Sequence, residues 1–203
     1  MSELFNGVRS LAQLRTVMRN CEQTKNLSVL EHGIQVARYF EDLRQHVIHG
    51  KPLKYEWRLP EWIYNEDLWA NVLPLKQVRE YQIYHDCGKP FCRVLDDEGR
   101  VHFPEHASVS ASLWRHLGGS EQTARLIKHD MDIHLLKASG LESFAHLPEA
   151  ATLLFTGLAE VTANASMFGG IDSTSFKIKF KQINKRGKAL IPYFQPMKEV
   201  ANG

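Results

Sequence analysis

The adjacent residues His85 and Asp86 carry the side chains best suited to metal chemistry in this sequence. They lie where a predicted helix ends, just before Gly88 and Lys89. Imidazole nitrogens and carboxylate oxygens together suit divalent transition metals. A carboxylate beside a histidine can bridge two such ions, and a bound ion both activates a water and neutralises charge on a phosphoryl oxygen. The doublet therefore indicates a hydrolytic metal centre.

Three further histidines and one glutamate fall on other predicted helices, as a metal centre inside a helical bundle requires. His32 lies in the middle of an amphipathic helix, His106 begins another helix, and His129 lies on a third. Glu160 lies in the most apolar helix, where a carboxylate is costly unless it binds a metal or a partner. The alternative for Glu160 is a position on the solvent edge of its helix.

Apolar residues at helical spacing predict an all-α fold of about seven helices in one domain, residues 1–203. The motif-bearing core covers about 28–168, and a basic C-terminal element covers 173–203. A short hairpin or a loop is expected at 93–103. A strand is the alternative for the last element, but its helical spacing extends further. The expected helices cover approximately 8–20, Asn26 or Ser28 to Gly50, 75–85, 106–117, 121–132, 148–168 and 173–190.

An aromatic-rich segment, residues 53–70, interrupts the helical pattern. We expect it to be a loop-rich insertion whose aromatic side chains anchor it on the core. The alternative is a flap over a pocket, in which the aromatic faces stack on a base. The residues concerned are Trp57, Trp62, Tyr64 and Trp69.

The composition is that of an ordinary globular domain, with 43% hydrophobic and 24% charged residues. The net charge of +2, with histidine neutral, gives no global argument for nucleic-acid binding. Three cysteines, Cys21, Cys87 and Cys92, fit a reducing compartment better than a disulfide scaffold. Cys87 and Cys92 lack the second cysteine pair of a zinc knuckle. Without a leader-like start or a long apolar stretch, we expect a cytoplasmic protein that makes no membrane contact. Its oligomeric state is left open.

Five short segments together resemble the HD superfamily of metal-dependent phosphohydrolases. They are Glu31-His32-Gly33, Tyr84-His85-Asp86-Cys87-Gly88-Lys89, Pro104-Glu105-His106-Ala107, Ile127-Lys128-His129 and Leu158-Ala159-Glu160-Val161-Thr162-Ala163. The family's order is a first histidine, the His-Asp doublet followed by Gly-Lys, two further histidines in binuclear members, and a late aspartate. The resemblance covers residues 30 to about 164 and implies an HD-type helical domain of the binuclear kind.

The resemblance implies two divalent transition-metal ions, of the Mn, Fe, Ni, Co or Zn kind. Glu160 stands where the family has its final aspartate, and Asp130 or His134 is an alternative for that ligand. The second metal position is implied by His106 and His129. The full expected ligand set is His32, His85, Asp86, His106, His129 and Glu160.

Substrate contacts and catalysis are likewise implied by the resemblance. Asp86 and Lys89 are the residues expected to carry catalysis, with Lys89 near the metal-bound phosphate as a positive charge for a phosphoryl oxygen. Lys89, Arg38 and Lys128 are the expected substrate contacts. The basic segment Lys177–Lys188 is either a solvated helix face or a contact for a phosphate backbone or polyphosphate.

The resulting hypothesis is a phosphohydrolase or phosphodiesterase that uses a metal-activated water. Its substrate would be the phosphoester of a nucleotide or of an RNA end. One alternative within the class is hydrolysis of nucleoside 5′-triphosphates. The alternative from another class is a non-catalytic HD-like module that binds RNA or a nucleotide.

Overall fold

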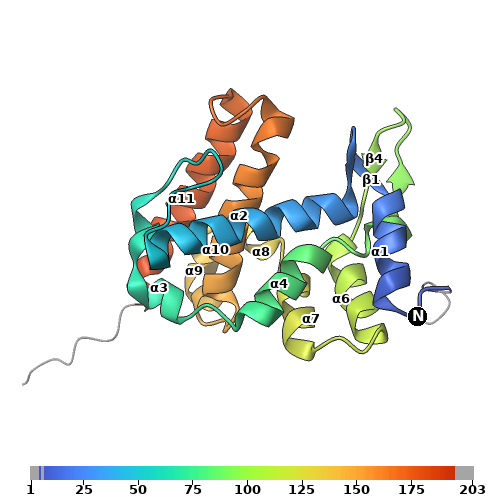
Figure 1. Cartoon of the computed structure of the whole chain (residues 1–203), viewed down its shortest axis with the longest axis horizontal. Helices are drawn as coiled ribbons and strands as arrows, with labels where there is room; N and C mark the ends of the chain where they lie inside the picture. Colours follow the sequence, from blue (N-terminus) through green and yellow to red (C-terminus); the bar gives the residue numbers. More distant parts are fainter. Residues whose placement is uncertain (1–4, 6, 195–203) are drawn as a thin grey trace, which may run out of the picture.

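The computed structural model describes residue 5 and residues 7–194, which form an all-α fold (Figure 1). The part of the chain described contains seven helices of eight or more residues, as the apolar spacing predicts. They are α1 (Leu11–Asn20), α2 (Val29–His49), α4 (Leu75–Tyr84), α6 (His106–His116), α7 (Glu121–Lys128), α10 (Ala150–Ala163) and α11 (Thr174–Phe194).

Helix α2 crosses the whole molecule in Figure 1, and its two ends carry clear start and stop signals. Ser28 is its N-cap and forms a capping box with Glu31, in which each side chain binds the backbone N–H of the other. Gly50 ends the helix in the left-handed conformation, at φ 64°, which glycine adopts without the steric cost of a Cβ. Of the two predicted caps, Asn26 and Ser28, the structure therefore uses Ser28.

A glycine allows α2 to approach the end of α4 at backbone contact. A Cβ at Gly33 would overlap the carbonyl oxygen of Ile83 and would lie 2.9 Å from that of Gln82. The neighbouring residue on α2 is His32, and the residues that follow α4 are His85 and Asp86. The close crossing therefore brings histidines from two distant parts of the sequence together.

Gly88 has the same function on the other side of the doublet. A Cβ at Gly88 would lie 2.5 Å from the backbone nitrogen of Ser110 and 2.9 Å from the carbonyl oxygen of His106. The Gly88 N–H also donates to the hydroxyl of Ser110 over 2.7 Å. The turn after α4 therefore packs directly on the first turns of α6, which His106 begins.

Helix α10 forms the centre of the hydrophobic core. Every residue of α10 except Glu160 is buried, so this helix has no polar face toward solvent. It packs against α2 on one side and α11 on the other. The last element, α11, is helical throughout its described length, which decides between the helix and the strand in favour of the helix. No helix in residues 7–194 has the length and apolar content needed to cross a bilayer.

Short elements connect the long helices. The structure confirms a hairpin within 93–103, where β3 (Val94–Leu95) pairs antiparallel with β4 (Val101–His102). A second hairpin, β1 (Glu22–Thr24) with β2 (Leu27–Ser28), was not expected, because strands of two and three residues are too short to show an alternating pattern. The one-turn helices are α3 (Glu66–Ala70), α5 (Lys89–Cys92), α8 (Asp132–Leu135) and α9 (Leu141–Ala145), and the 3₁₀ turns are η2 (Glu61–Tyr64), η3 (Ala138–Gly140) and η4 (Asn164–Phe168).

The aromatic segment 53–70 is anchored on the core by its tryptophans. Each indole N–H has a partner: Trp57 donates to Asp42 over 3.0 Å, and Trp62 donates to Asn184 over 3.2 Å. Trp69 donates to a backbone carbonyl over 2.7 Å, and its ring stacks on Phe155 with centroids 3.9 Å apart. These contacts support the interpretation of an anchored insertion, since the indoles are used in packing.

The helix crossing gives a first prediction. Gly33→Ala should lower the free energy of unfolding by about 1–3 kcal/mol, because the added methyl group meets backbone atoms of α4 that cannot rotate away. In an exposed helix the same substitution would stabilise by up to about 1 kcal/mol. Urea unfolding measures the difference. Gln35→Ala on the same helix is the matched control, expected within about 0.5 kcal/mol of wild type. A Gly33→Ala protein as stable as wild type would disprove the close crossing.

Candidate metal centre

Three buried side chains, His32, His85 and Asp86, offer ligand atoms that all lie within 4.8 Å of one another. The Asp86 Oδ2 atom lies 3.7 Å from His32 Nε2 and 3.2 Å from His85 Nε2. The two imidazole rings meet nearly edge to face, with centroids 5.2 Å apart. All three residues are at most 2% exposed. The structure therefore brings His32 together with His85 and Asp86, as the sequence analysis expected.

The hydrogen bonds of this group leave imidazole nitrogens without partners. His85 Nδ1 lies 2.9 Å from the carbonyl oxygen of Gln82, and because a carbonyl only accepts, Nδ1 carries the proton. In the neutral ring, Nε2 then presents a lone pair to the Asp86 carboxylate. Among the described residues, His85 Nε2 and both ring nitrogens of His32 lack a hydrogen-bond partner. Buried polar atoms without partners are costly, so a cation among them, either a metal ion or the proton that His85 carries when no metal is bound, would stabilise the arrangement.

The separations of these atoms also fit a shared ion. Two ligands each at about 2.1 Å from a tetrahedral zinc ion are about 3.4 Å apart. The nitrogen-to-oxygen distances of 3.2 Å and 3.7 Å bracket that value. The donor set of two imidazoles and a carboxylate is one that zinc, iron, manganese, nickel and cobalt accept. The group can therefore hold a divalent metal ion.

Lys89 completes the surroundings of the Asp86 carboxylate. Its Nζ donates to Asp86 Oδ2 over 2.6 Å and to Gln23 Oε1 over 3.0 Å, and it lies 5.4 Å from the centre of the Phe103 ring. Burial alone would raise the pKa of Asp86, but the charges of His85 and Lys89 outweigh burial and hold that pKa well below its usual value. Asp86 is therefore ionised at neutral pH.

His106 and His129 share one feature of the His85 ring. His106 Nδ1 donates to the carbonyl oxygen of Phe103 over 3.0 Å, and its Nε2 lies 3.6 Å from Asp86 Oδ1. His129 Nδ1 lies 2.7 Å from the Asp132 carboxylate. Both rings are fixed by Nδ1, the arrangement in which a metal-binding histidine presents Nε2. His106 thus approaches the second oxygen of Asp86. His129 is outside the three-residue group, and its described contact is with Asp132.

Glu160 lies at the edge of the group and has two histidine neighbours. One carboxylate oxygen, Oε1, is 3.7 Å from His32 Nε2, and the other, Oε2, is 3.0 Å from His134 Nε2. Burial alone raises the pKa of Glu160, but the charge and hydrogen bond of His134 outweigh it and keep the pKa well below its usual value. The solvent-edge alternative for Glu160 thus gives way to a largely buried carboxylate, with a side chain 19% exposed.

Asp130 is buried behind His85 and is held by a residue that the sequence analysis did not select. The hydroxyl of Tyr81 donates to Asp130 over 2.6 Å. Burial raises the pKa of Asp130, and its ionised form would still attract His85. Tyr81 and Gln82 precede His85 by about one helical turn, so an i−3 or i−4 search along the predicted helix would have found both. Gln23, which binds Lys89, has no such signal, because it lies on the short β1 strand.

The ring of His85 is strongly affected by the carboxylates around it. Burial alone would lower the pKa of His85, but Asp86, Asp130 and Glu160 outweigh it and raise the pKa to about 10. Without a metal the ring is therefore protonated at neutral pH. A metal ion that binds Nε2 must displace that proton.

A pocket of about 300 Å³ is lined by Glu160, whose carboxylate lies 3.7 Å from His32 Nε2, and by His134. Its opposite wall is α11, which contributes Lys179 and Arg186. Two cations of the basic segment Lys177–Lys188 therefore reach the same pocket as Glu160.

Two predicted substrate contacts lie elsewhere. Arg38 lines a different pocket, on the side of α2 that faces away from His32. Lys128 is exposed at the end of α7, next to His129. Cys21, Cys87 and Cys92 are free thiols, and Cys87 is buried, where it contacts the carbonyl oxygen of Ser110 at 3.6 Å. Among the described residues, the candidate metal group contains no cysteine.

Comparisons with known proteins add no relative. No protein-family model matches the sequence, and neither the curated proteins nor the solved structures contain a match. The functional argument for this chain therefore rests on the geometry of the site and on the motifs of its sequence.

The two ring nitrogens of His32, which have no hydrogen-bond partner among the described residues, give a second prediction. The purified protein should bind Zn²⁺ or Mn²⁺, and His32→Ala should weaken binding at least about 100-fold, since even indirect partners of metal ligands contribute 10–100-fold. His49→Ala is the matched control, because His49 lies on the same helix, is exposed and should leave binding unchanged. Elemental analysis and metal titration measure both. Equal metal binding by the two variants would contradict the site.

The protonated ring of His85 gives a third prediction, on pH. Since the metal competes with a proton held with a pKa of about 10, the apparent metal affinity should rise as the pH rises below that value. The expected slope is at least about tenfold per pH unit between about pH 6.5 and 8.5. Calorimetry in two buffers of different ionisation enthalpy measures the released proton. An affinity that is flat over this range would be inconsistent with the charge state of His85.

Proposed function

We propose that this protein is a metal-dependent phosphohydrolase of the HD type. The observation that carries the proposal is the buried group of His32, His85 and Asp86, in which three imidazole nitrogens have no hydrogen-bond partner among the described residues. The resemblance of the sequence to the HD superfamily supports the same assignment. A divalent metal, when bound, supplies charge neutralisation and an activated water for hydrolysis of a phosphoester.

The residues of the chain have distinct roles in this proposal. Asp86 presents Oδ2 to His32 and His85 and presents Oδ1 to His106, so its carboxylate faces two neighbouring positions at once. His32, His85 and Asp86 would hold one divalent ion, and the approach of His106 to the second oxygen of Asp86 supports the proposal of a second ion beside it. His106 and His129, each fixed through Nδ1, are then the ligands proposed for the second ion.

Glu160 is the proposed final ligand in preference to Asp130 or His134. Its Oε1 is directed toward His32, while Oε2 is held by His134, which orients the carboxylate. Asp130 is instead engaged with Tyr81. His134 is therefore proposed as a positioning residue for Glu160.

The substrate is proposed to be a nucleotide or a nucleic-acid end that enters through the pocket beside Glu160. Lys179 and Arg186 line this pocket and would attract the phosphate groups of a substrate. Lys89, which donates to Asp86, would add a positive charge for a phosphoryl oxygen at the metal group. Both features favour an anionic substrate over a neutral one.

The fourth prediction is an activity. With Mn²⁺, Ni²⁺, Co²⁺ or Zn²⁺, the protein should hydrolyse at least one member of a panel of bis-p-nitrophenyl phosphate, cyclic nucleotides, nucleoside 2′-phosphates and deoxynucleoside triphosphates. Asp86→Asn should lower kcat on the order of 1000-fold or more, because it removes the charge that both candidate metal positions share. Turnover that survives this substitution would rule out the proposed centre.

A control separates the substrate pocket from the metal group. Lys179→Gln should raise KM for the active substrate with a small effect on kcat, whereas Lys181→Gln, also exposed on α11 but outside the pocket lining, should alter neither constant. If the protein binds nucleotide but hydrolyses no substrate with any of the metals, the hypothesis of a non-catalytic binding module is favoured over that of an enzyme.

A further inference from the structure

A second, larger pocket lies along the outer side of α2. It has a volume of about 520 Å³ and is bounded by α1, α2, α4 and the loop that follows α2. We call it the α2 groove, and its lining includes Ile34, Ala37, Glu41 and Gln45 from α2. Its volume is in the range of small-molecule sites, which runs from about 300 to 1,000 Å³.

The α2 groove is on the opposite side of the helix from the candidate metal group. At 100° per residue, Ile34 and Glu41 lie about 180–200° around α2 from His32. His32 faces the core and α10, while Ile34 and Glu41 face the groove. A ligand in the groove is therefore separated from the metal group by the helix itself.

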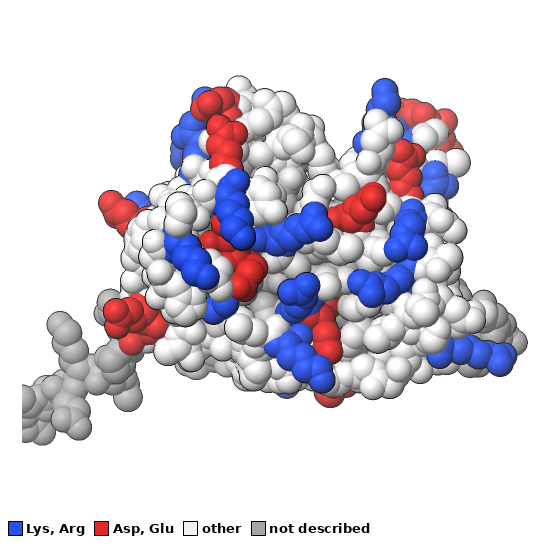
Figure 2. Space-filling view, in the orientation of Figure 1, with Lys and Arg blue, Asp and Glu red and all other residues white. Residues whose placement is uncertain are grey.

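Five cations line the groove, and none has an ion-pair partner within 4.0 Å among the described residues. They come from four parts of the fold, and all five are exposed: Arg15 from α1, Arg38 from α2, Lys51 and Lys54 from the following loop, and Arg79 from α4. Figure 2 shows basic side chains spread over this face, around a smaller acidic area. Five unpaired cations around one cavity attract an anion with several charges.

The two carboxylates of the groove are already occupied. Glu41 binds Arg44 through two hydrogen bonds of 2.8 Å and also accepts from Gln45. Asp42 accepts hydrogen bonds from the backbone N–H groups of Lys54 and Tyr55 and from the indole N–H of Trp57. Arg44 balances the charge of Glu41, and Asp42 keeps its negative charge because its donors are neutral N–H groups. The five cations outnumber this one carboxylate, so the groove carries a net positive charge.

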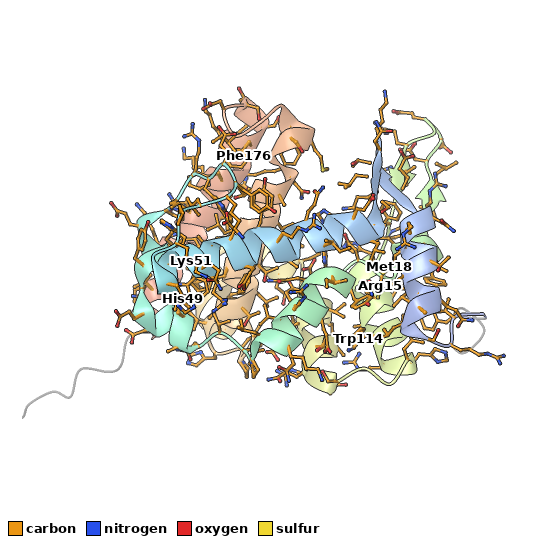
Figure 3. All side chains as sticks on the ribbon, in the orientation of Figure 1. Arg15, Met18, His49, Lys51, Trp114 and Phe176 are labelled. Carbon is orange, nitrogen blue, oxygen red and sulfur yellow. The ribbon has the colours of Figure 1, made fainter. Side chains whose placement is uncertain are left out.

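The groove is long and has an aromatic ring at one end. Residues 34 and 45, both in its wall, are about 17 Å apart along the helix. Figure 3 places Arg15 and Lys51 toward opposite ends of α2. Tyr55 lines the groove, is 36% exposed, and has one ring face stacked on Tyr39 with centroids 4.3 Å apart. The pairing with Tyr39 fixes the ring, which can then support a flat group of the ligand.

We propose that the α2 groove binds a nucleoside polyphosphate, with its phosphates among the arginines and its base against Tyr55. An elongated cavity with several cations fits a chain of phosphates better than a single inorganic phosphate. Single-stranded nucleic acid fits less well, because such sites use a series of aromatic side chains and an open basic track. Among the described residues that line the groove, Tyr55 is the one exposed aromatic. The site is additional to the metal group and does not depend on the proposed function.

The test uses calorimetric titration of the full chain with the β,γ-imido analogue of ATP, which resists hydrolysis. Arg15→Gln/Arg79→Gln removes one groove cation from α1 and one from α4. Since each charged hydrogen bond contributes about tenfold or more, this double variant should bind about 100-fold more weakly than wild type. The matched control is Arg19→Gln/Lys76→Gln, which removes one exposed cation from each of the same two helices outside the groove and should bind within about twofold of wild type.

A further variant and two further probes identify the ligand class. Tyr55→Leu should weaken binding of the ATP analogue but leave binding of tripolyphosphate, which has no base, unchanged. Equal losses in both double variants, or no binding to wild type at about 1 mM, would overturn the site. Tighter binding of a single-stranded oligonucleotide than of the ATP analogue, lost on Arg15→Gln/Arg79→Gln, would overturn the ligand class.

Discussion

The structure depends on one buried charge, the carboxylate of Asp86. A carboxylate in the interior is expensive unless cations or hydrogen-bond donors surround it. Here Lys89 donates to it, and imidazoles of His32, His85 and His106 approach it from three helices. Most of the long helices of the core contribute to or pack around this point, since α2 and α10 pack together, α4 ends at the doublet, and α6 begins with His106. The fold is thus organised so that this charge stays buried and available to a cation.

The backbone can converge on Asp86 because two positions lack a side chain. At Gly33 the α2 backbone touches the carbonyls that end α4, and at Gly88 the turn after the doublet touches the start of α6. Any larger residue would push the helices apart by more than the few tenths of an ångström that a metal centre tolerates. The two glycines therefore influence the candidate metal site indirectly, because they set the distances between the backbones that carry its side chains. Each glycine also lies in one of the segments that resemble the HD superfamily.

Helix α2 separates two regions of different character. Its inner face presents His32 to the buried group with His85 and Asp86, and its outer face carries Arg38 into the cation-lined α2 groove. The 3.6-residue period makes this division unavoidable, because Arg38 is about 240° around the helix from His32. Arg38 therefore points away from a substrate bound at the metal group. Its position favours a role in the α2 groove instead.

Residue types and spacing were sufficient to predict the all-α fold and the seven long helices, because amphipathic period is a local property of the sequence. The grouping of His32 with His85 and Asp86 was implied only by the resemblance to the HD superfamily, since no local pattern joins residues so far apart in the chain. Other features depended on the tertiary structure. The sequence favoured Glu160 for the last ligand and left Asp130 and His134 as alternatives, and only packing decided that Glu160 faces His32 while Tyr81 holds Asp130. The same is true of the contact between Lys89 and Gln23 and of the α2 groove, whose cations come from four separate segments. Such contacts join residues far apart in the chain, so no local pattern records them.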